Sequence, residues 1–361
     1  MNWKYDHLRH VPRHRLVVLA DEVMNRAEFP DMEAREWDAR SVPRRIWRRL
    51  AAERLYPADT LLLRGLAPRV LHSHFGYVAV RDHALHTALG TPWVVSFYGA
   101  DVFELTRQQD VVDRYAAVFG AARSVLALGP FMAESLHALG CPLHKIRVHP
   151  LGVDLDDLPF HPRTRQPGER LKILFAGTFR EKKGVPYLLR AVSLLRGQGH
   201  RVELHLVGDA ANKPGDDEHK GEIHRLIGKL DLESTVTIRP FLPFRDVVEL
   251  ALSCHVLAAP SVTAENGDAE GTPFIIQQMM GTGMPVVSTR HSDIPFIFGD
   301  LADRLVPERD AHALAAALHV YAADTEAAVR DAPLFRSHVE AHLDVRVHAA
   351  ALADLYDELI V

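Results

Sequence analysis

The sequence predicts two α/β domains, each built on a parallel β-sheet that helices cover on both faces. Short apolar runs rich in Val, Ile and Leu alternate with segments of helical period along the chain, a pattern typical of strand–helix–strand units. With 361 residues, the chain is longer than one hydrophobic core usually serves. Near the middle, residues 157–170 contain three prolines and no periodicity, so we predict a linker there.

The second half of the chain shows the alternation most clearly. Within 185–199, Leu188, Val192 and Leu195 recur at helical spacing and define one apolar face. The strands predicted in this half are 171–178, 202–209, 236–241, 255–261 and 284–290, and the helices are 185–199, 221–232, 244–254 and 272–283. Residues 171–335 are therefore predicted to form a doubly wound, Rossmann-like domain.

The first half repeats the pattern less regularly. Its predicted strands are 14–21, 69–76, 92–99, 124–129 and 146–154, and its predicted helices lie around Ile46–Arg54, Asp82–Leu89, Val111–Ala121 and Phe131–Leu139. Residues 1–156 are expected to form a second Rossmann-like domain. Two such domains create a cleft, and open parallel sheets bind ligands at the carboxyl ends of their strands.

The composition excludes several classes of protein. A net charge of −5 gives no general attraction to nucleic acid, so we expect no nucleic-acid partner. Cys141 and Cys254 lack the spacing of a metal site. No apolar run approaches the roughly 18 residues of a membrane span, and the first fifteen residues are polar and basic. We therefore expect a cytoplasmic protein.

The first candidate site is the stretch "FAGTFREKKGVPYLL". A strand is predicted to end at Gly177, a short loop carries Arg180, Lys182 and Lys183, and a helix opens after Gly184. Basic side chains beside the unpaired N–H groups of a helix start form an anion site. The alternative is a solvated charged loop. The stretch contains no G-x-G-x-x-G dinucleotide fingerprint.

The second candidate site is the corner that begins at Glu270. Pro273 suits the first turn of a helix, and Gly271 lets the backbone approach a ligand closely. Free amides of residues 272–274 could hold a phosphate, and Glu270 could accept hydrogen bonds from hydroxyl groups. The alternative for Glu270 is an acid that the helix dipole favours. Gln278 lies about two helical turns beyond Glu270, so both could face one site.

These motifs resemble a known family. "GTFREKKG" and "HVLAAPSVTAENGDAEGTPFIIQQMMGTGMPVVSTRHSDIP" together resemble the donor half of the retaining glycosyltransferases of family 4, which have the GT-B fold. In the first half, "VLHSHFG", "PWVVSFYGADV" and "LGCPLHKIRVHPLGVDL" resemble matching segments of the same family. The resemblance covers nearly the whole chain, and its nearest members act in bacterial exopolysaccharide, lipopolysaccharide or natural-product pathways.

The resemblance implies a set of site residues. Lys183 would hold the donor diphosphate, Glu270 would contact the donor sugar, and position 278 would meet the ribose. The loop "SFYGAD" would reach the sugar and the acceptor from the first domain. The catalytic residues predicted in this way are Glu270, Lys183, Arg180 and Asp101. The predicted donor-binding residues are Gly177, Thr178, Gly271, Thr272, Pro273, Phe274, Gln278 and Tyr98.

The resemblance also implies the reaction and its participants. A sugar would move from a nucleotide-diphosphate donor, a uridine one, to a hydroxyl of a glycan, lipid-linked or natural-product acceptor. The donor is a co-substrate, and no cofactor or metal is expected. The leaving diphosphate, stabilised by Lys183, Arg180 and helix amides, would be the main source of catalysis. Residues 336–361 resemble the family's closing helix, which crosses back to the first domain.

The chain departs from the family pattern at several places. Gln278 stands where the family usually has Glu, so a hydrogen bond to ribose would lose charge assistance. Thr178 stands where Arg is common, and Arg180 is our candidate substitute. Residues 1–21 resemble the segment that comes just after the family's first strand and glycine-rich loop. We therefore expect the first domain to lack its first β-unit, with a gap in the centre of its sheet.

Two further alternatives stay open from the sequence. The segment Arg40–Arg54 has six arginines against one acid, which suits weak peripheral contact with a membrane and the inner membrane face as location. The alternative, which we favour, is a solvated helix whose apolar stripe packs on the domain. For function, the alternative to an enzyme is a non-catalytic GT-B binding or scaffold protein of a glycan pathway. A sugar-nucleotide epimerase is a more distant alternative, since no residue is identified that would hold its intermediate.

Overall fold

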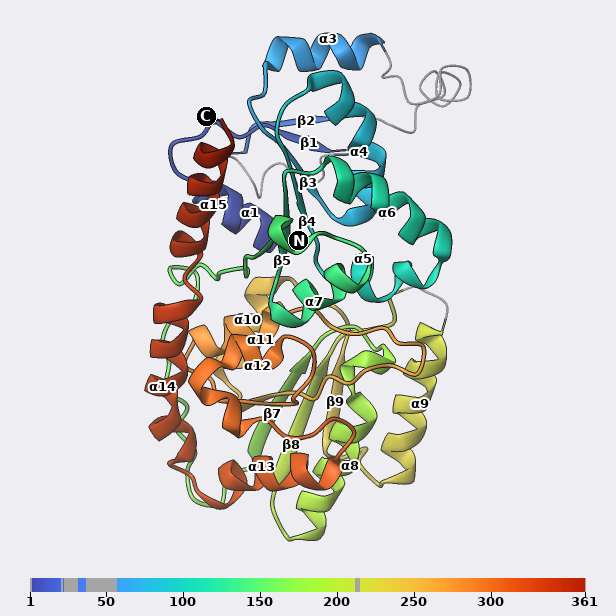
Figure 1. Ribbon diagram of the computed structural model, residues 1–361. Coiled ribbons are helices and arrows are strands. Elements are labelled where there is room, and N and C mark those ends of the chain that lie inside the picture. Colours follow the sequence, from blue (N-terminus) through green and yellow to red (C-terminus); the bar gives the residue numbers. More distant parts are fainter. Residues whose placement is uncertain (1, 21, 23–31, 37–56, 212–214, 361) are drawn as a thin grey trace. The chain divides into compact units, whose positions relative to one another are not determined.

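A computed structural model of the chain describes residues 2–20, 22, 32–36, 57–211 and 215–360. The chain divides into two compact units (Figure 1). The first unit combines Met1–Gly152 with Val345–Val361, and the second unit is Val153–Asp344. Both units are α/β with parallel sheets, which confirms the predicted fold class.

The second unit contains a five-stranded parallel sheet in the order β11-β10-β7-β8-β9. Its strands are β7 (Leu171–Ala176), β8 (Val202–Val207), β9 (Val236–Arg239), β10 (Val256–Ala259) and β11 (Val286–Ser288). All five lie within segments that the sequence predicts to be strands. The sheet order reverses beside β7, because β8 follows on one side and β10 on the other. A reversal of this kind is where open α/β sheets bind ligands.

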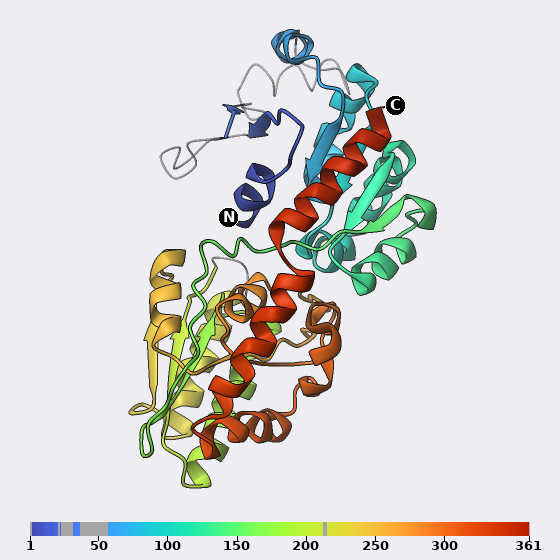
Figure 2. The same cartoon turned by 90° about the vertical axis from the view of Figure 1, so that its left-hand side faces the viewer.

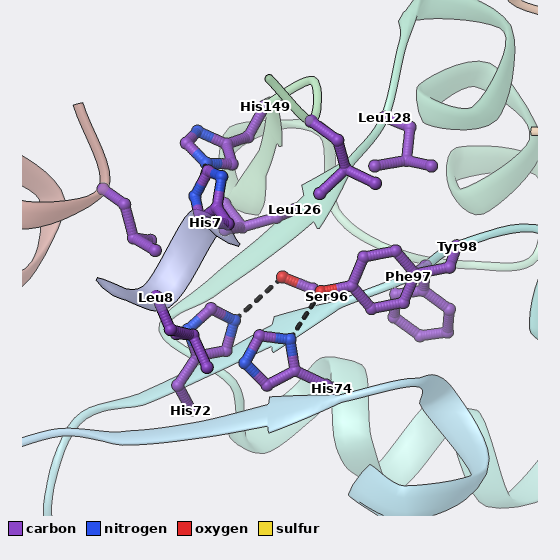
Figure 3. A pocket seen from close by; sticks show the side chains of 12 residues that line it. His7, Leu8, His72, His74, Ser96, Phe97, Tyr98, Leu126, Leu128 and His149 are labelled. Atoms are coloured by element: carbon purple, nitrogen blue, oxygen red, sulfur yellow. Dashed lines mark hydrogen bonds between the residues drawn. The ribbon is translucent and has the colours of Figure 1, made fainter. Parts of the chain in front are cut away.

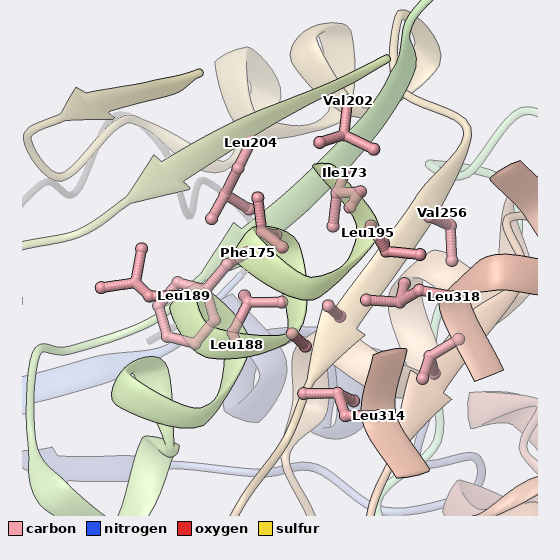
Figure 4. Packing of buried hydrophobic residues seen from close by; sticks show 14 of the residues in the cluster. Ile173, Phe175, Leu188, Leu189, Leu195, Val202, Leu204, Val256, Leu314 and Leu318 are labelled. Atoms are coloured by element: carbon pink, nitrogen blue, oxygen red, sulfur yellow. The ribbon is translucent and has the colours of Figure 1, made fainter. Parts of the chain in front are cut away.

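Helices cover both faces of this sheet. They are α8 (Val185–Gly197), α9 (Asp216–Lys229), α10 (Phe244–Leu252), α11 (Phe274–Gly281), α12 (Ile294–Phe298), α13 (Ala311–Ala323) and α14 (Ala327–His342), with 3₁₀ turns η4 (Glu181–Lys183) and η5 (Gly299–Arg304). On one face, Leu188 and Leu195 of α8 and Leu314 of α13 pack with Ile173 and Phe175 of β7 (Figure 4). On the other face, α10, α11, α12 and α14 contribute to a second cluster.

The segment 157–170, predicted to be a linker, belongs to the second unit and is tied to it by a buried arginine. Arg163 is 2% exposed, and it donates to the carbonyl oxygen and, at 2.7 Å, to the hydroxyl of Thr282 at the end of α11. Burial lowers the pKa of Arg163 to about 10. The prolines of this segment correctly predict an irregular backbone. They do not indicate that the segment packs against the second unit.

The first unit contains a four-stranded parallel sheet in the order β3-β4-β5-β6. Its strands are β3 (Leu71–His74), β4 (Trp93–Ser96), β5 (Ser124–Ala127) and β6 (Ile146–Val148). The helices are α1 (Asn2–Arg9), α3 (Pro57–Leu66), α4 (Gly76–Leu89), α5 (Ala100–Phe103), α6 (Gln109–Ala121), α7 (Pro130–Ala138) and α15 (Val345–Ile360), with 3₁₀ turns η2 (Leu105–Arg107) and η3 (Leu143–Lys145).

The last helix, α15, covers one face of this sheet (Figure 2). Ala349, Leu352 and Ala353 pack against Val94 of β4 and Leu126 of β5. The stretch that the sequence analysis treats as one closing helix from residue 336 is two helices. The first of them, α14, ends at His342 within the second unit, and α15 belongs to the first.

Two strands of the first unit stand apart from this sheet. Strands β1 (Val18–Ala20) and β2 (Ala34–Glu36) pair in parallel with each other as a separate two-stranded sheet. Residues of β1 and β3 line one cavity of about 850 Å³. The described strands of the first unit thus form two separate sheets. The expected loss of a first β-unit stays a prediction.

None of the helices among the described residues combines the length and the apolarity that crossing a membrane requires. The basic segment Arg40–Arg54 lies within residues 37–56, outside the described residues, so its predicted membrane contact stays a prediction.

Candidate active site

The loop after β7 brings the first candidate motif to the carboxyl edge of the second unit's sheet. Gly177 follows β7, and the side-chain carbons of Lys183 lie against it, since a Cβ at Gly177 would lie 3.5 Å from Lys183 Cε. Gly184, the N-cap of α8, then has a φ of +67°. A Cβ at this position would lie 1.9 Å from the carbonyl oxygen of Pro260, so only glycine fits.

The basic side chains of this loop meet the acidic corner near Glu270. Lys183 Nζ lies 3.0 Å from Glu270 Oε2, and Lys182 Nζ lies 3.1 Å from Asp268 Oδ1 and 3.5 Å from Glu270 Oε1. Arg180 reaches Asp268 at 3.2 Å and Asp216 at 3.3 Å. These six residues, which we call the ion network, contain three cations and three carboxylates. Their side chains are all less than one fifth exposed.

The charges within the network determine the ionisation state of Glu270. Burial alone would raise the pKa of this carboxyl group, but Lys183 and Lys182 outweigh burial and lower the pKa to about 2. Burial alone would lower the pKa of Lys182. The carboxylates of Glu270 and Asp268 outweigh the effect of burial, so the pKa of Lys182 is raised. Glu270 is therefore an anion at neutral pH.

One oxygen of Glu270 keeps hydrogen-bonding capacity. Glu270 is 8% exposed, and its Oε1 faces Lys182 Nζ at 3.5 Å but accepts no hydrogen bond from any residue that the structure describes. The hydroxyl of Thr272, two residues on, is also buried without a partner among those residues. Buried polar atoms normally have partners. Two such atoms beside one corner are therefore the expected features of a site that binds a polar ligand.

The corner leads into α11, where the two glutamines differ. Pro273 is the N-cap of α11, and the first amides of a helix have no intrahelical acceptor. Gln278 is 9% exposed, whereas Gln277 is fully buried, and its side-chain amide has no hydrogen-bond partner within the described part of the chain. Gln278, the glutamine predicted to bind the donor, is thus the more exposed of the two.

In the first unit, Asp101 links the loop after β4 to the start of α4. Its Oδ1 accepts hydrogen bonds from the amides of Tyr98 at 3.0 Å and Gly99 at 2.9 Å, and its Oδ2 accepts one from Gly76 at 2.9 Å. Asp101 is fully buried, and burial raises its pKa despite these donors. This geometry supports a role in shaping the loop "SFYGAD". A direct contact of Asp101 with a substrate stays a prediction.

Tyr98 lies beside a small histidine-lined cavity of the first unit (Figure 3). Its hydroxyl is 2.5 Å from His74 Nδ1, and His72 Nε2 is 2.8 Å from Ser96 Oγ. The cavity measures about 20 Å³, which is room for about one water molecule and not for a sugar ring. Burial raises the pKa of Tyr98, so its hydroxyl stays protonated at neutral pH.

The structure therefore brings three predicted residues into one network, namely Glu270, Lys183 and Arg180. Gly177 lies against Lys183, and Gly271 and Thr272 follow Glu270 in the same corner. Thr178 and Phe274 belong to the same two segments, at the carboxyl end of β7 and the start of α11. Tyr98 and Asp101 belong to the first unit.

Several members of this site are not predicted from the sequence. Asp268 and Asp216 join the ion network, and His291 contacts the backbone of Glu270 at 3.0 Å. Asp268 could have been found from the sequence, because it is an acidic residue only two positions before Glu270. Asp216 lies far from the motifs in sequence, and no local pattern marks it. His291 lies within the quoted segment 255–295, but no role was assigned to it from the sequence.

Comparison with known proteins identifies the family. Residues 7–157 match the family model described as Glycosyltransferase Family 4, and residues 170–324 match the one described as Glycosyl transferases group 1. The amylovoran biosynthesis glycosyltransferase AmsK of Erwinia amylovora is 30% identical over 291 residues, which are 79% of this chain and 69% of AmsK. The chain therefore belongs to the same family of glycosyltransferases.

Other relatives and solved structures agree. The putative colanic acid biosynthesis glycosyltransferase WcaL of Escherichia coli is 32% identical over 266 residues, 73% of this chain and 63% of WcaL. This chain thus spans about two thirds of the length of both relatives. A crystal structure of Anabaena Alr3699/HepE in complex with UDP and glucose matches with a TM-score of 0.79 at 18% identity, covering 99% of this chain and 95% of that one. This likeness shows that the fold is GT-B.

Proposed function

We propose that this glycosyltransferase moves a sugar from a nucleotide-diphosphate donor to a hydroxyl of a glycan, lipid-linked or natural-product acceptor, with retention at the sugar carbon. The observation that carries the proposal is the ion network around Glu270. It places two ammonium groups and a buried carboxylate with an unused acceptor at the carboxyl edge of a parallel sheet.

The network contains the groups that sugar transfer needs. As the bond between sugar and diphosphate breaks, negative charge grows on the diphosphate oxygens. Lys183, Arg180 and the first amides of α8 and α11 would stabilise that charge. Glu270, ionised at neutral pH, would accept hydrogen bonds from sugar hydroxyls through Oε1. No covalent nucleophile is required in this account. The acceptor oxygen would bond to the sugar carbon on the face from which the diphosphate departs, and the departing phosphate oxygen would take the proton of the acceptor hydroxyl.

The comparisons support the kind of donor and pathway. HepE was crystallised in complex with UDP and glucose, AmsK is named for amylovoran biosynthesis, and WcaL is named as a putative glycosyltransferase of colanic acid biosynthesis. By analogy we infer a uridine donor and an exopolysaccharide pathway. We also infer a cytoplasmic site of action at the inner face of the membrane, where a lipid-linked acceptor would lie. Recovery of the protein outside the cytoplasmic and membrane fractions of cells would contradict this location.

Thermal unfolding in the presence of UDP tests the site. At UDP near 100 times its Kd, mass action predicts about 2.7 kcal/mol of stabilisation, or a rise in Tm of about 5 °C or more. Lys183→Ala should abolish most of this rise because it removes a cation that faces the diphosphate. The matched control is Lys229→Ala, since Lys229 is exposed in the last turn of α9.

The control should show the same rise as the unaltered protein. Equal rises in Lys183→Ala and Lys229→Ala would contradict the assignment of the diphosphate site. No rise in the unaltered protein would contradict a uridine nucleotide, and a repeat with ADP, GDP and dTDP would then test the nucleotide-diphosphate class itself.

A further inference from the structure

A buried histidine supports the backbone of Glu270. His291 comes after β11 in the chain and is 1% exposed. The backbone amide of Glu270 donates a hydrogen bond to His291 Nε2 at 3.0 Å. On the other side of the ring, His291 Nδ1 lies 2.6 Å from Glu308 Oε1. The imidazole therefore connects the main chain at Glu270 to a carboxylate that is distant in the sequence.

The chemistry of these two contacts determines which ring nitrogen of His291 carries the proton. A backbone N–H can only donate, so Nε2 must accept and carries no proton. The ring proton is then on Nδ1, from where it donates to the carboxylate of Glu308. A carboxylate that accepts from one ring nitrogen sets the tautomer and orientation of the other, as in histidines that ligate metals.

Glu308 also holds the beginning of the loop that ends at Glu270. Its Oε2 accepts the amide of Thr263 at 2.7 Å, and its Oε1 lies 3.4 Å from the hydroxyl of Thr263. Thr263 belongs to the loop between β10 and α11, which contains Asp268 and Glu270. One carboxylate therefore secures this loop at two points, directly at Thr263 and through His291 at Glu270.

Neighbouring charges reinforce the same loop. Arg309 Nη2 donates to the carbonyl oxygen of Thr263 at 2.5 Å and to Glu181 Oε1 at 3.1 Å. Glu181 in turn accepts the amide of Glu265 at 3.0 Å. Glu181 precedes Lys182 and Lys183, so the acidic loop and the basic loop of the ion network are attached to each other outside the network itself.

We propose that His291, held by Glu308, is a positioning residue that sets the main chain of Glu270, and so places its carboxylate for the donor sugar. The inference rests on the proposed function of Glu270. A displacement of about 1 Å in a group that positions a substrate can cost on the order of 100-fold in rate. His291 has no direct part in holding the diphosphate. Its loss should therefore lower kcat far more than it weakens UDP binding.

Three variants separate positioning from general stability. His291→Leu removes the acceptor for the Glu270 amide. His291→Gln can return an acceptor, because the glutamine side-chain oxygen reaches about as far as Nε2. Glu308→Gln changes a residue that is partly exposed. Its single side-chain oxygen can accept from either His291 Nδ1 or the amide of Thr263, and its NH₂ group then faces the other of these two donors. This third variant keeps the test valid if His291→Leu fails to fold.

The matched control is a second buried histidine in the same unit. His255 is 4% exposed and accepts the amide of Lys172 through Nδ1 at 2.9 Å. His255→Leu therefore also removes a buried acceptor for a backbone amide, but at a place with no contact to Glu270 among the described residues. It should lower Tm without a selective loss of kcat.

The measurements are kcat and KM for turnover of a UDP-sugar, and Kd for UDP by calorimetry. We expect His291→Leu to lower kcat about 10- to 100-fold with less than about a threefold change in the Kd for UDP. His291→Gln should recover much of that kcat, and Glu308→Gln should be intermediate. Losses no larger than that of His255→Leu, or no recovery in His291→Gln, would overturn the proposal. If the unaltered protein neither binds UDP nor turns over a sugar nucleotide, the proposed function fails instead.

Discussion

At the residue scale, the behaviour of Glu270 follows from its neighbours. A carboxylate this buried would ordinarily be protonated more easily than one in water. Lys183 and Lys182 reverse that tendency and lower its pKa from 4.5 to about 2. The same contacts that prepare Glu270 as an acceptor for sugar hydroxyls therefore also contribute to the stability of the second unit.

This coupling predicts a dependence of stability on pH. Because the folded-state pKa of Glu270 is below its unfolded value, the contribution is fully present above about pH 4.5. It is lost as the pH falls from about 4.5 towards 2, since the folded protein must then bind a proton at a buried ion pair. Glu270→Gln should flatten the fall in the free energy of unfolding across this range.

Urea unfolding at pH 7, 5, 4 and 3 measures this effect. Other carboxylates with lowered pKa, such as Glu169 and Asp324, titrate in both proteins and cancel in the comparison. Equal slopes of unfolding free energy against pH in the unaltered protein and Glu270→Gln would show that Glu270 is not held ionised by the two lysines.

At the element scale, the site depends on how closely α8 approaches the end of β10. Gly184, the N-cap of α8, has a positive φ, and its Cα faces the carbonyl oxygen of Pro260. This approach brings η4, with Lys182 and Lys183, next to the loop that carries Asp268 and Glu270. Glycine is needed here for two independent reasons, namely its backbone conformation and the lack of space for a Cβ.

Replacement of this glycine tests the approach. Gly184→Ala should lower the free energy of unfolding by about 2 kcal/mol or more, from the strained φ and from overlap with Pro260. Gly197→Ala is the matched control at the other end of α8. A Cβ there would meet no atom of the described residues within 4 Å, and alanine should stabilise the helix by up to about 1 kcal/mol. Similar changes in both variants, measured by urea unfolding, would contradict the close approach.

The elements differ in how well their sequences predict them. Strands of the second unit are short, β-branched and bounded by turns, so their ranges are evident from the sequence. Helix α13 was not predicted. Its sequence AHALAAALHVYAA is almost entirely small or apolar, so no polar face marks a helical period. Helix α14 contains Pro333 within its span, and proline in a sequence ordinarily argues against a helix.

At the scale of the whole molecule, the sequence predicts two α/β domains and their motifs but not the contacts between distant segments. Glu270 and Lys183 are recognisable because a local pattern surrounds each. Their direct pairing, the third carboxylate from Asp216 and the support from His291 arise only when loops after different strands meet at one edge of the sheet. Burial of Asp101 was equally invisible, because its partners are backbone amides that any sequence provides.

The central claim is that the ion network is the donor site of a sugar transferase, and turnover by Glu270→Gln tests it most directly. This variant keeps the shape of the side chain and removes its charge. Glu249→Gln is the control, because Glu249 is an exposed residue of α10. Release of UDP from a panel of UDP-sugars with a polysaccharide or lipid-linked acceptor would be measured for each protein.

We expect the control to match the unaltered protein and Glu270→Gln to lose on the order of 100-fold in kcat. Undiminished kcat in Glu270→Gln, in a preparation whose unaltered form transfers sugar, would contradict the account.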